Sequence, residues 1–167
     1  MRLSLITVLV TFALVLVFGS SASATSTPSG SWRFAGTPTA VEAMEASLER
    51  ATSELNFVVR GIARSRLRDE CRPWSALRIQ RSGNKVLIST DTRTIASPLG
   101  VEIRRNSAEG DMRVRRFLKG DTLVEHMAID KGSRINVYHV RGDHVRVDST
   151  IKSTRLASPI KFSYTYR

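Results

Sequence analysis

Five polar side chains in the second half of the chain fall in phase with the apolar residues of predicted strands. They are Arg116, Glu125, His139, Tyr164 and Tyr166. On the inner face of a curved sheet, a charged pair, an imidazole and two phenol groups among aliphatic side chains would suit an amphipathic ligand. Arg116 and Glu125 could instead form a structural ion pair. An error of one residue in strand register would place all five side chains on the outer face.

Arginines also recur at helical spacing earlier in the chain, where Arg60, Arg64 and Arg68 fall on one helix face. The planar guanidinium group binds phosphate through two parallel hydrogen bonds. This face could therefore dock on anionic lipid headgroups. The alternative is a solvated face whose arginines pair with nearby carboxylates, supplied by Asp69 and Glu70.

The histidines and serines form no pattern that supports metal binding or catalysis. His126, His139 and His144 make no His-x-His pair and accompany no repeat of carboxylates, so the sequence predicts no metal site. No Gly-x-Ser-x-Gly motif marks a catalytic serine. We expect no catalytic site and no cofactor, and we expect that the protein is not an enzyme.

Residues 73–167 have the pattern of an antiparallel meander. Apolar and polar residues alternate, and turn sequences such as those around Gly120 and Gly142 separate the apolar runs. No crossover helix lies between the runs, so about eight or nine strands should pair antiparallel. A sheet of this length curls into a barrel or half-barrel. Together with a helical segment before it, the meander predicts an α+β fold.

The alternation also predicts which strand residues face inward. The predicted inward sets are Met112, Val114, Arg116 and Leu118; Leu123, Glu125, Met127 and Ile129; Ile135, Val137 and His139; Val145, Val147 and Ile151; and Ile160, Phe162, Tyr164 and Tyr166. If the last set faces the interior, two tyrosine hydroxyl groups are buried, and each of them needs a hydrogen-bond partner.

Residues 37–70 are predicted to be helical, because apolar residues recur at spacings of three and four. The stripe consists of Val41, Met44, Leu48, Ala51, Leu55, Val58 and Ile62. An unbroken helix over residues 39–68 would be about 45 Å long at ~1.5 Å per residue, which is hardly less than the width of the domain. We therefore expect two helices, or one helix bent near Asn56 and Gly61. The alternative is a coiled-coil dimer, although alanine and methionine pack poorly at the interface positions of a coiled coil.

Residues 1–24 have the features of a signal peptide. A short cationic start precedes the uncharged apolar run Leu3–Phe18, and Ala22-Ser23-Ala24 fits the small-x-small pattern of signal peptidase sites. We expect cleavage after Ala24 and a secreted or periplasmic protein. The alternative is an uncleaved membrane anchor, but the run is shorter than the ~20 residues that a spanning helix needs. Residues 25–36 would then form a flexible lead-in with a short first strand at Trp32–Phe34.

The chain is strongly basic, with 26 Lys and Arg against 15 Asp and Glu and a net charge of +11. A charge of this sign implies an anionic partner. For an exported protein, an anionic membrane surface or envelope polymer is a more natural partner than nucleic acid. The single cysteine, Cys71, excludes an intrachain disulfide, and its neighbours Pro73 and Trp74 predict that it is buried. We expect a monomer.

The predicted fold opens with Gly30-Ser31-Trp32, continues with a helical segment and ends its meander in Tyr164-Thr165-Tyr166-Arg167. This order resembles the calycin superfamily, and a helix after the first strand is more similar to the fatty-acid-binding proteins than to the lipocalins. The resemblance implies a β-barrel or half-barrel and a lipophilic ligand. If Tyr166 matches the tyrosine of that family's Arg-x-Tyr pair, Tyr164 occupies the arginine position, and the family's carboxylate anchor is missing.

Two functions stay open on the sequence. The first is an exported, lipocalin-like binding protein that holds a lipophilic, anionic small molecule or lipid inside the sheet. The second is an envelope or periplasmic structural or interaction protein, in which the helix stripe fills the concavity and the arginine face meets an anionic surface. An internal ligand would distinguish the first function from the second.

Overall fold

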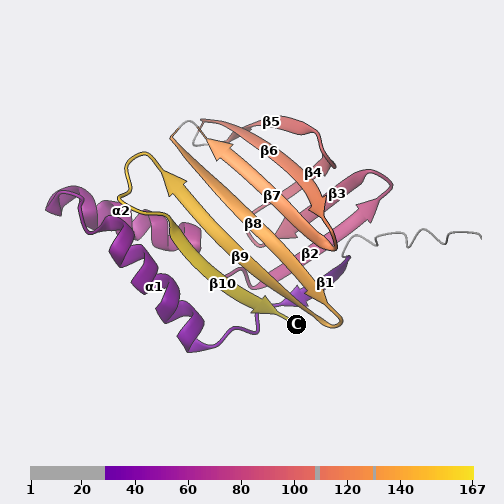
Figure 1. Cartoon of the computed structure of the whole chain (residues 1–167), viewed down its shortest axis with the longest axis horizontal. Coiled ribbons are helices and arrows are strands. Elements are labelled where there is room, and N and C mark those ends of the chain that lie inside the picture. Colours follow the sequence, from indigo (N-terminus) through magenta and orange to yellow (C-terminus); the bar gives the residue numbers. More distant parts are fainter. Residues whose placement is uncertain (1–28, 108–109, 130) are drawn as a thin grey trace, which may run out of the picture.

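The computed structural model describes residues 29–107, 110–129 and 131–167. The predicted signal peptide, residues 1–24, therefore lies outside the described residues. The described chain forms two helices and ten strands (Figure 1). In chain order these are β1 (Gly30–Arg33), α1 (Pro38–Thr52), α2 (Phe57–Cys71), β2 (Ala76–Ser82), β3 (Lys85–Thr90), β4 (Thr94–Pro98), β5 (Glu102–Ser107), β6 (Gly110–Lys119), β7 (Thr122–Ile129), β8 (Gly132–Arg141), β9 (His144–Ser153) and β10 (Ile160–Tyr166).

The strands form two antiparallel sheets whose order follows the sequence. One sheet holds β1 to β4 and the other holds β5 to β10. The tight turns between β6 and β7 and between β8 and β9 contain Gly120 and Gly142, each with φ of 58°. Glycine adopts this left-handed conformation without steric cost, which lets neighbouring strands reverse direction in two residues. The predicted up-and-down meander is confirmed.

The two sheets meet at both sides without closing into a barrel. An isolated antiparallel bridge joins Phe34 to Tyr166 on one side, and a parallel bridge joins Leu99 to Arg116 on the other. Side chains from both sheets and from α1 share one hydrophobic core. The α+β fold class is therefore confirmed, while the strand pairing leaves the sheets unclosed.

The helical segment consists of two helices rather than one bent helix. α1 ends at Thr52, and the Asn56 side chain caps α2 by accepting a hydrogen bond from the Val58 amide at 3.1 Å. α1 lies along β10 (Figure 1) and buries Met44 and Leu48. Within the described ranges, no helix is long and apolar enough to span a membrane.

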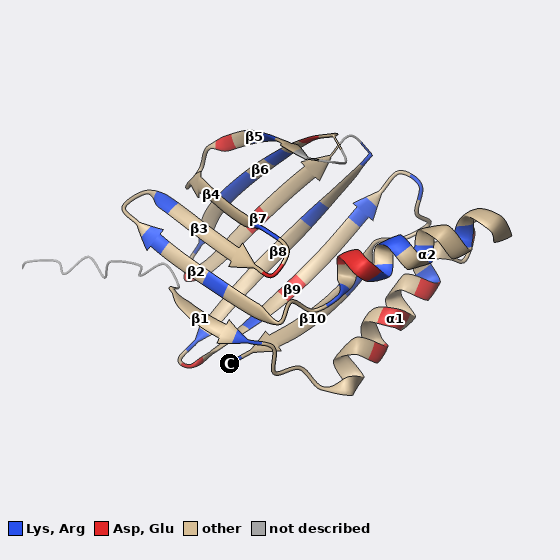
Figure 2. Ribbon diagram, turned by 180° about the vertical axis from the view of Figure 1, so that it is seen from behind, with Lys and Arg blue, Asp and Glu red and all other residues tan. Residues whose placement is uncertain are grey.

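The predicted apolar stripe holds in α1 and is wrong in α2. Val58 and Ile62 are 69% and 58% exposed, because α2 turns its arginine side toward α1. For example, Arg68 donates to Glu45 at 2.6 Å through Nε. Figure 2 shows acidic segments of α1 beside basic segments of α2. Charge pairs between the two helices, rather than a shared apolar seam, therefore set how α2 lies.

Candidate functional site

A cavity of about 490 Å³ lies at one end of the six-stranded sheet, beside the C-terminal half of α2. β6 and β8 begin at this end and β7 and β9 finish there, because neighbouring strands run antiparallel. Its described lining residues are Leu67, Glu70, Arg93, Met112, Met127, Ile129, Lys131, Gly132, Ser133, Arg134, Ile151, Lys152, Ser153 and Arg155.

The lining of this cavity combines apolar walls with an excess of positive charge. Leucine, methionine and isoleucine side chains come from α2, β6, β7 and β9. Five of the described lining residues are Lys or Arg, whereas one of them, Glu70, is acidic. Such a lining favours a ligand that has an apolar body and an anionic group.

Arg134, in the first half of β8, is fixed in the wall of the cavity. Its guanidinium group lies between the rings of Trp74 and Phe162, at 5.2 and 5.6 Å from their centroids. Nε donates to Asn136 Oδ1 at 2.9 Å, and Nη1 donates to the Glu70 carbonyl at 2.8 Å. Among the described residues, no acceptor takes a hydrogen bond from Nη2. This nitrogen is therefore available to a ligand.

Arg93, between β3 and β4, brings a second guanidinium group to the same place. Its Cζ lies 5.9 Å from the centroid of the Trp74 ring that Arg134 also covers. Within the described chain, neither arginine forms an ion pair with a carboxylate. Burial, and then the charge of Arg93, lower the pKa of Arg134. A bound anion would stabilise the charged form of Arg134, so the pair of arginines is suited to hold one.

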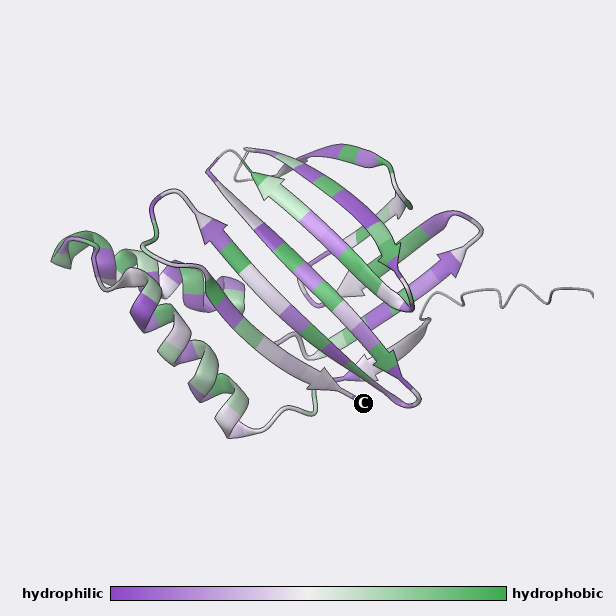
Figure 3. Cartoon of the chain, viewed as in Figure 1, coloured by the Kyte–Doolittle hydropathy of each residue, from purple (hydrophilic) through white to green (hydrophobic). Residues whose placement is uncertain are grey.

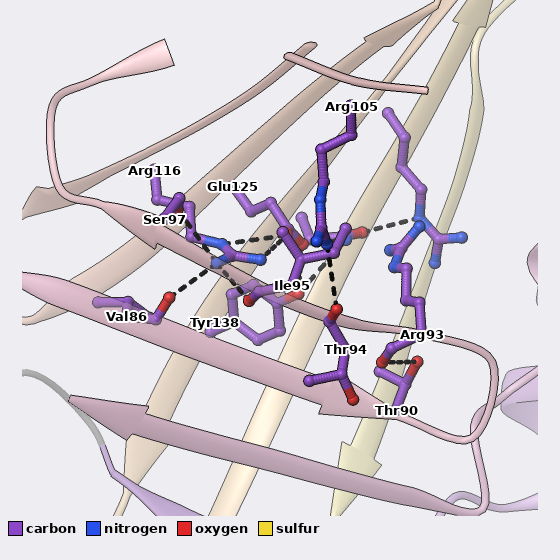
Figure 4. Close-up of polar contacts among 12 residues, drawn as sticks. Val86, Thr90, Arg93, Thr94, Ile95, Ser97, Arg105, Arg116, Glu125 and Tyr138 are labelled. Atoms are coloured by element: carbon purple, nitrogen blue, oxygen red, sulfur yellow. Dashed lines mark hydrogen bonds and ion pairs between the residues drawn. The ribbon is translucent and has the colours of Figure 1, made fainter. Parts of the chain in front are cut away.

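The predicted residues Arg116 and Glu125 form a buried ion pair in the interior (Figure 4). Nε and Nη2 of Arg116 donate to one carboxylate oxygen of Glu125 at 3.1 and 2.7 Å. Nη1 donates to the carbonyls of Val86 and Ile95 and to Ser97 Oγ. Since these three residues belong to β3 and β4, Arg116 ties the two sheets together.

The carboxylate of Glu125 is fully occupied by this network. Its second oxygen accepts hydrogen bonds from Tyr138 Oη at 2.8 Å and from Asn136 Nδ2 at 3.1 Å. Burial raises the pKa of Glu125, but the charges of Arg116 and then Arg93 outweigh this effect and hold the pKa below its ordinary value. Neither member of the ion pair lines the cavity. Their contact with a ligand stays a prediction. Among the described residues, the carboxylate of Glu125 accepts its hydrogen bonds from Arg116, Asn136 and Tyr138, although its charge also acts on Arg93 and Arg134.

The predicted inner face of β8 is wrong by one residue. His139 lies on the outer face, where its Nε2 is 3.1 Å from Asp148 Oδ2. The even-numbered residues face inward, and both Asn136 and Tyr138 are fully buried. Asn136 lies opposite Glu125 in the register of β7 and β8. A buried carboxylate needs donors on the neighbouring strand, and this requirement outweighs burial of the isoleucine and valine on the other face.

Sequence reasoning missed Arg93, Arg134 and Asn136. Arg93 lies in a turn, where no alternation predicts a direction. Arg134, Asn136 and Tyr138 do alternate, and they occupy the strand after the one that carries the inward Glu125. This polar face beside a buried carboxylate was the signal that could have identified Arg134 and Asn136.

Tyr164 and Tyr166 face the interior as predicted, and both hydroxyl groups have partners. Tyr164 Oη donates to the Cys71 carbonyl at 3.0 Å, and Tyr166 Oη accepts from the Trp74 amide at 3.3 Å. Burial raises the pKa of Tyr166 to about 12. Cys71 is buried, as predicted. The two tyrosines fix the end of α2 and the ring of Trp74 from behind the cavity, and their contact with a ligand stays a prediction.

The three predicted surface arginines of α2 lie against α1 and the loop that follows it. Arg60 donates to the Leu55 carbonyl, Arg64 pairs with Glu49 and Arg68 pairs with Glu45. The partners of Arg64 and Arg68 are thus carboxylates of α1 rather than Asp69 and Glu70, the expected ones. These contacts occupy the guanidinium groups, and docking on an anionic surface stays a prediction for them.

The outward side of α2 is apolar instead. The side chains that we call the α2 apolar tip are Phe57, Val58, Val59 and Ile62, which are 86%, 69%, 53% and 58% exposed. Figure 3 shows the apolar colour at the free start of α2, which projects away from the sheets. α2 is therefore amphipathic, but its charged side faces the protein and its apolar side faces solvent.

No known family model matches this chain, and no curated protein matches it in sequence. Solved structures do match it in fold. An abundant heat soluble (SAHS) protein of Ramazzottius varieornatus has a TM-score of 0.52 at 12% identity, over 83% of this chain and 93% of that one. The fatty-acid-binding protein of Manduca sexta has a TM-score of 0.50 at 13% identity, over 85% and 100%. Human cRBP IV has a TM-score of 0.51 at 14% identity, over 85% and 98%.

These matches confirm the calycin-like fold that the sequence resembles. They cover the helices as well as the strands, because each spans more than four fifths of this chain. At identities this low the likeness concerns the fold alone. A function has to be argued from the cavity and its residues.

Proposed function

We propose that this chain is an exported, monomeric binding protein for a lipophilic small molecule or lipid that carries an anionic group. The observation that carries the proposal is an apolar cavity with two arginines, Arg93 and Arg134, that have no carboxylate partner among the described residues. Export rests on the sequence of residues 1–24 alone. Binding rather than catalysis is supported by the neighbours in fold, which include a fatty-acid-binding protein.

The two parts of the lining would do different work. Each methylene that moves from water into the apolar part contributes about 0.8 kcal/mol, so most of the affinity comes from the tail. Hydrogen bonds to a charged group contribute about 1.5–3 kcal/mol each, and they also fix which end of the ligand enters first. Met127 and Ile151 would face the tail, while Arg134 Nη2 would donate to the anion.

Arg134 offers a substitute for the carboxylate anchor that the sequence lacks at Tyr164. It comes from β8, whereas Tyr164 belongs to β10. Because Asn136, Glu70 and two aromatic rings hold the guanidinium group in place, little side-chain entropy remains to be lost on binding. A ligand anion would therefore meet a preformed site.

Native mass spectrometry of protein purified from its own host tests this proposal. The expected result is one class of anionic lipophile at near-unit occupancy, which extraction then identifies. Protein that is empty, and that stays empty after incubation with a panel of anionic lipids, would contradict the proposal. Sequencing of the mature N-terminus checks the export step, for which the expected first residue is Thr25.

A second candidate function, contact with a lipid surface, is favoured by the α2 apolar tip. Exposed side chains as large as Phe57 insert into the boundary between headgroups and acyl chains when a protein binds a bilayer. The tip adjoins the half of α2 that lines the cavity, so surface contact and ligand uptake would use one helix. Sedimentation with anionic vesicles tests this candidate, and protein that stays in the supernatant at low salt would contradict it.

A further inference from the structure

A second hollow, of about 500 Å³, adjoins the first at the two arginines. Glu70, Arg93 and Arg134 line both this hollow and the cavity described above. Trp74, whose ring both guanidinium groups cover, belongs to the second hollow only. The arginine pair is therefore a wall that two compartments share.

The two compartments differ in chemistry. The first is walled by methionine, isoleucine and leucine side chains. The second adds the polar side chains of Asp69, Arg72 and Thr92, with Trp74 and Phe34 as its aromatic part. A hydroxylated group finds both donors and acceptors in the second compartment, whereas an alkyl chain finds its match in the first.

We propose that the ligand is a two-part amphiphile whose anionic group is internal, with its tail in the first cavity and a hydroxylated headgroup in the second hollow. This inference rests on the proposed function and names the ligand class, which is a lysophospholipid-like phosphodiester. A phosphodiester carries substituents on two of its oxygens, so it can be held at the shared wall while its two ends enter different compartments. A fatty acid has one substituent on its carboxyl carbon and would leave the second hollow to water.

Three ligands with the same acyl or alkyl length separate the parts of this proposal: myristate, myristyl phosphate and the phosphodiester of myristyl alcohol and glycerol. Dissociation constants are measured by titration calorimetry below the critical micelle concentrations. Two added hydrogen bonds would make the glycerol-bearing ligand about tenfold tighter than myristyl phosphate, which corresponds to about 1.4 kcal/mol. Equal or weaker binding of the glycerol-bearing ligand would overturn the two-part ligand.

The substitution Thr92→Trp tests the place of the headgroup. Thr92 is exposed in the turn between β3 and β4 and lines the second hollow only. An indole there fills the hollow, so we expect the tenfold advantage to disappear while binding of myristyl phosphate stays within about twofold. The matched control is Thr39→Trp, an exposed threonine of α1 that lines neither compartment.

The outcomes distinguish failure of the two-part ligand from failure of the proposed function. In Thr92→Trp, the affinities of all three ligands could fall in parallel, or the glycerol-bearing ligand could still bind tenfold more tightly than myristyl phosphate. Either result would mean that the headgroup does not lie in the second hollow, and the inference would be overturned. If none of the three ligands binds the unaltered protein, the proposed function itself fails. If myristate and myristyl phosphate bind and the glycerol adds nothing, the proposed function stands and the two-part ligand does not.

Discussion

Arg93 and Arg134 place their guanidinium groups over one indole ring, that of Trp74, at 5.9 and 5.2 Å from its centroid. The charge of Arg93 disfavours the charged form of Arg134 and so raises the free energy of the protein that holds no anion. The charge of the buried Glu125 carboxylate acts on both arginines, but its ion pair is with Arg116. An arrangement that costs stability and is neutralised by an anion is what a binding site for an anionic ligand requires.

The ion pair of Arg116 and Glu125 should be important for stability. The substitution Glu125→Gln leaves Arg116 buried without a compensating charge, and we expect a loss of about 3 kcal/mol in the free energy of unfolding. Urea denaturation followed by tryptophan fluorescence measures it. The double variant Arg116→Met/Glu125→Leu removes both charges and should lose less than the single variant. A larger loss in the double variant would contradict this account of the network.

Stability should fall in acid for the same reason. The folded pKa of Glu125 lies below its ordinary value of 4.5, so its contribution is fully present above pH 4.5 and is lost as the pH falls through the folded pKa. We expect the unaltered protein to lose stability over this range more steeply than Arg116→Met/Glu125→Leu. Denaturation curves at a series of pH values test this, and parallel losses in the two proteins would show that other carboxylates dominate.

The thiol of Cys71 should be inert in the folded protein. Burial raises its pKa to about 12, so at pH 8 almost none of it is the reactive thiolate. We expect Ellman's reagent to modify Cys71 only after denaturant is added. Modification of the native protein at the rate of a free thiol would show that the contact between Cys71 and Tyr164 opens readily.

The α2 apolar tip should contribute little to folding and much to binding of a lipid surface. The double substitution Phe57→Ser/Val58→Ser removes exposed side chains, so we expect a change within about 0.5 kcal/mol in the free energy of unfolding. The same variant should sediment less with anionic vesicles than the unaltered protein. Reduced stability without reduced sedimentation would mean that the tip packs against the protein and does not contact lipid.

The meander and its turns were predictable because they depend on local patterns. Alternation along β9 and β10 predicted that Val147 and Tyr164 are buried, and the structure agrees. The same rule was wrong for β8, where apolar Ile135 and Val137 compete with Asn136 and Tyr138 for the inner face. A buried carboxylate on β7 decides that competition, and its partners on β8 are fixed by register rather than by hydrophobicity.

Tertiary charge pairs explain the other differences from prediction. The spacing of Val58 and Ile62 continues the α1 stripe, yet both are exposed, because Arg64 and Arg68 pair with carboxylates of α1. The sequence showed the helical period of α2, but it did not show which face of α2 packs against α1. Arg93 was missed because a turn residue has no predictable direction until the two sheets come together.

Binding of myristyl phosphate by Arg134→Met shows whether Arg134 holds the anionic group of the ligand. Methionine keeps the unbranched stem between Trp74 and Phe162 and removes the charge, while Arg141→Met, at the exposed far end of β8, is the matched control. The account predicts saturable binding to the unaltered protein and to Arg141→Met, with affinity at least about tenfold lower for Arg134→Met. Equal affinities in all three proteins, with circular dichroism showing each one folded, would contradict an anion site at Arg134.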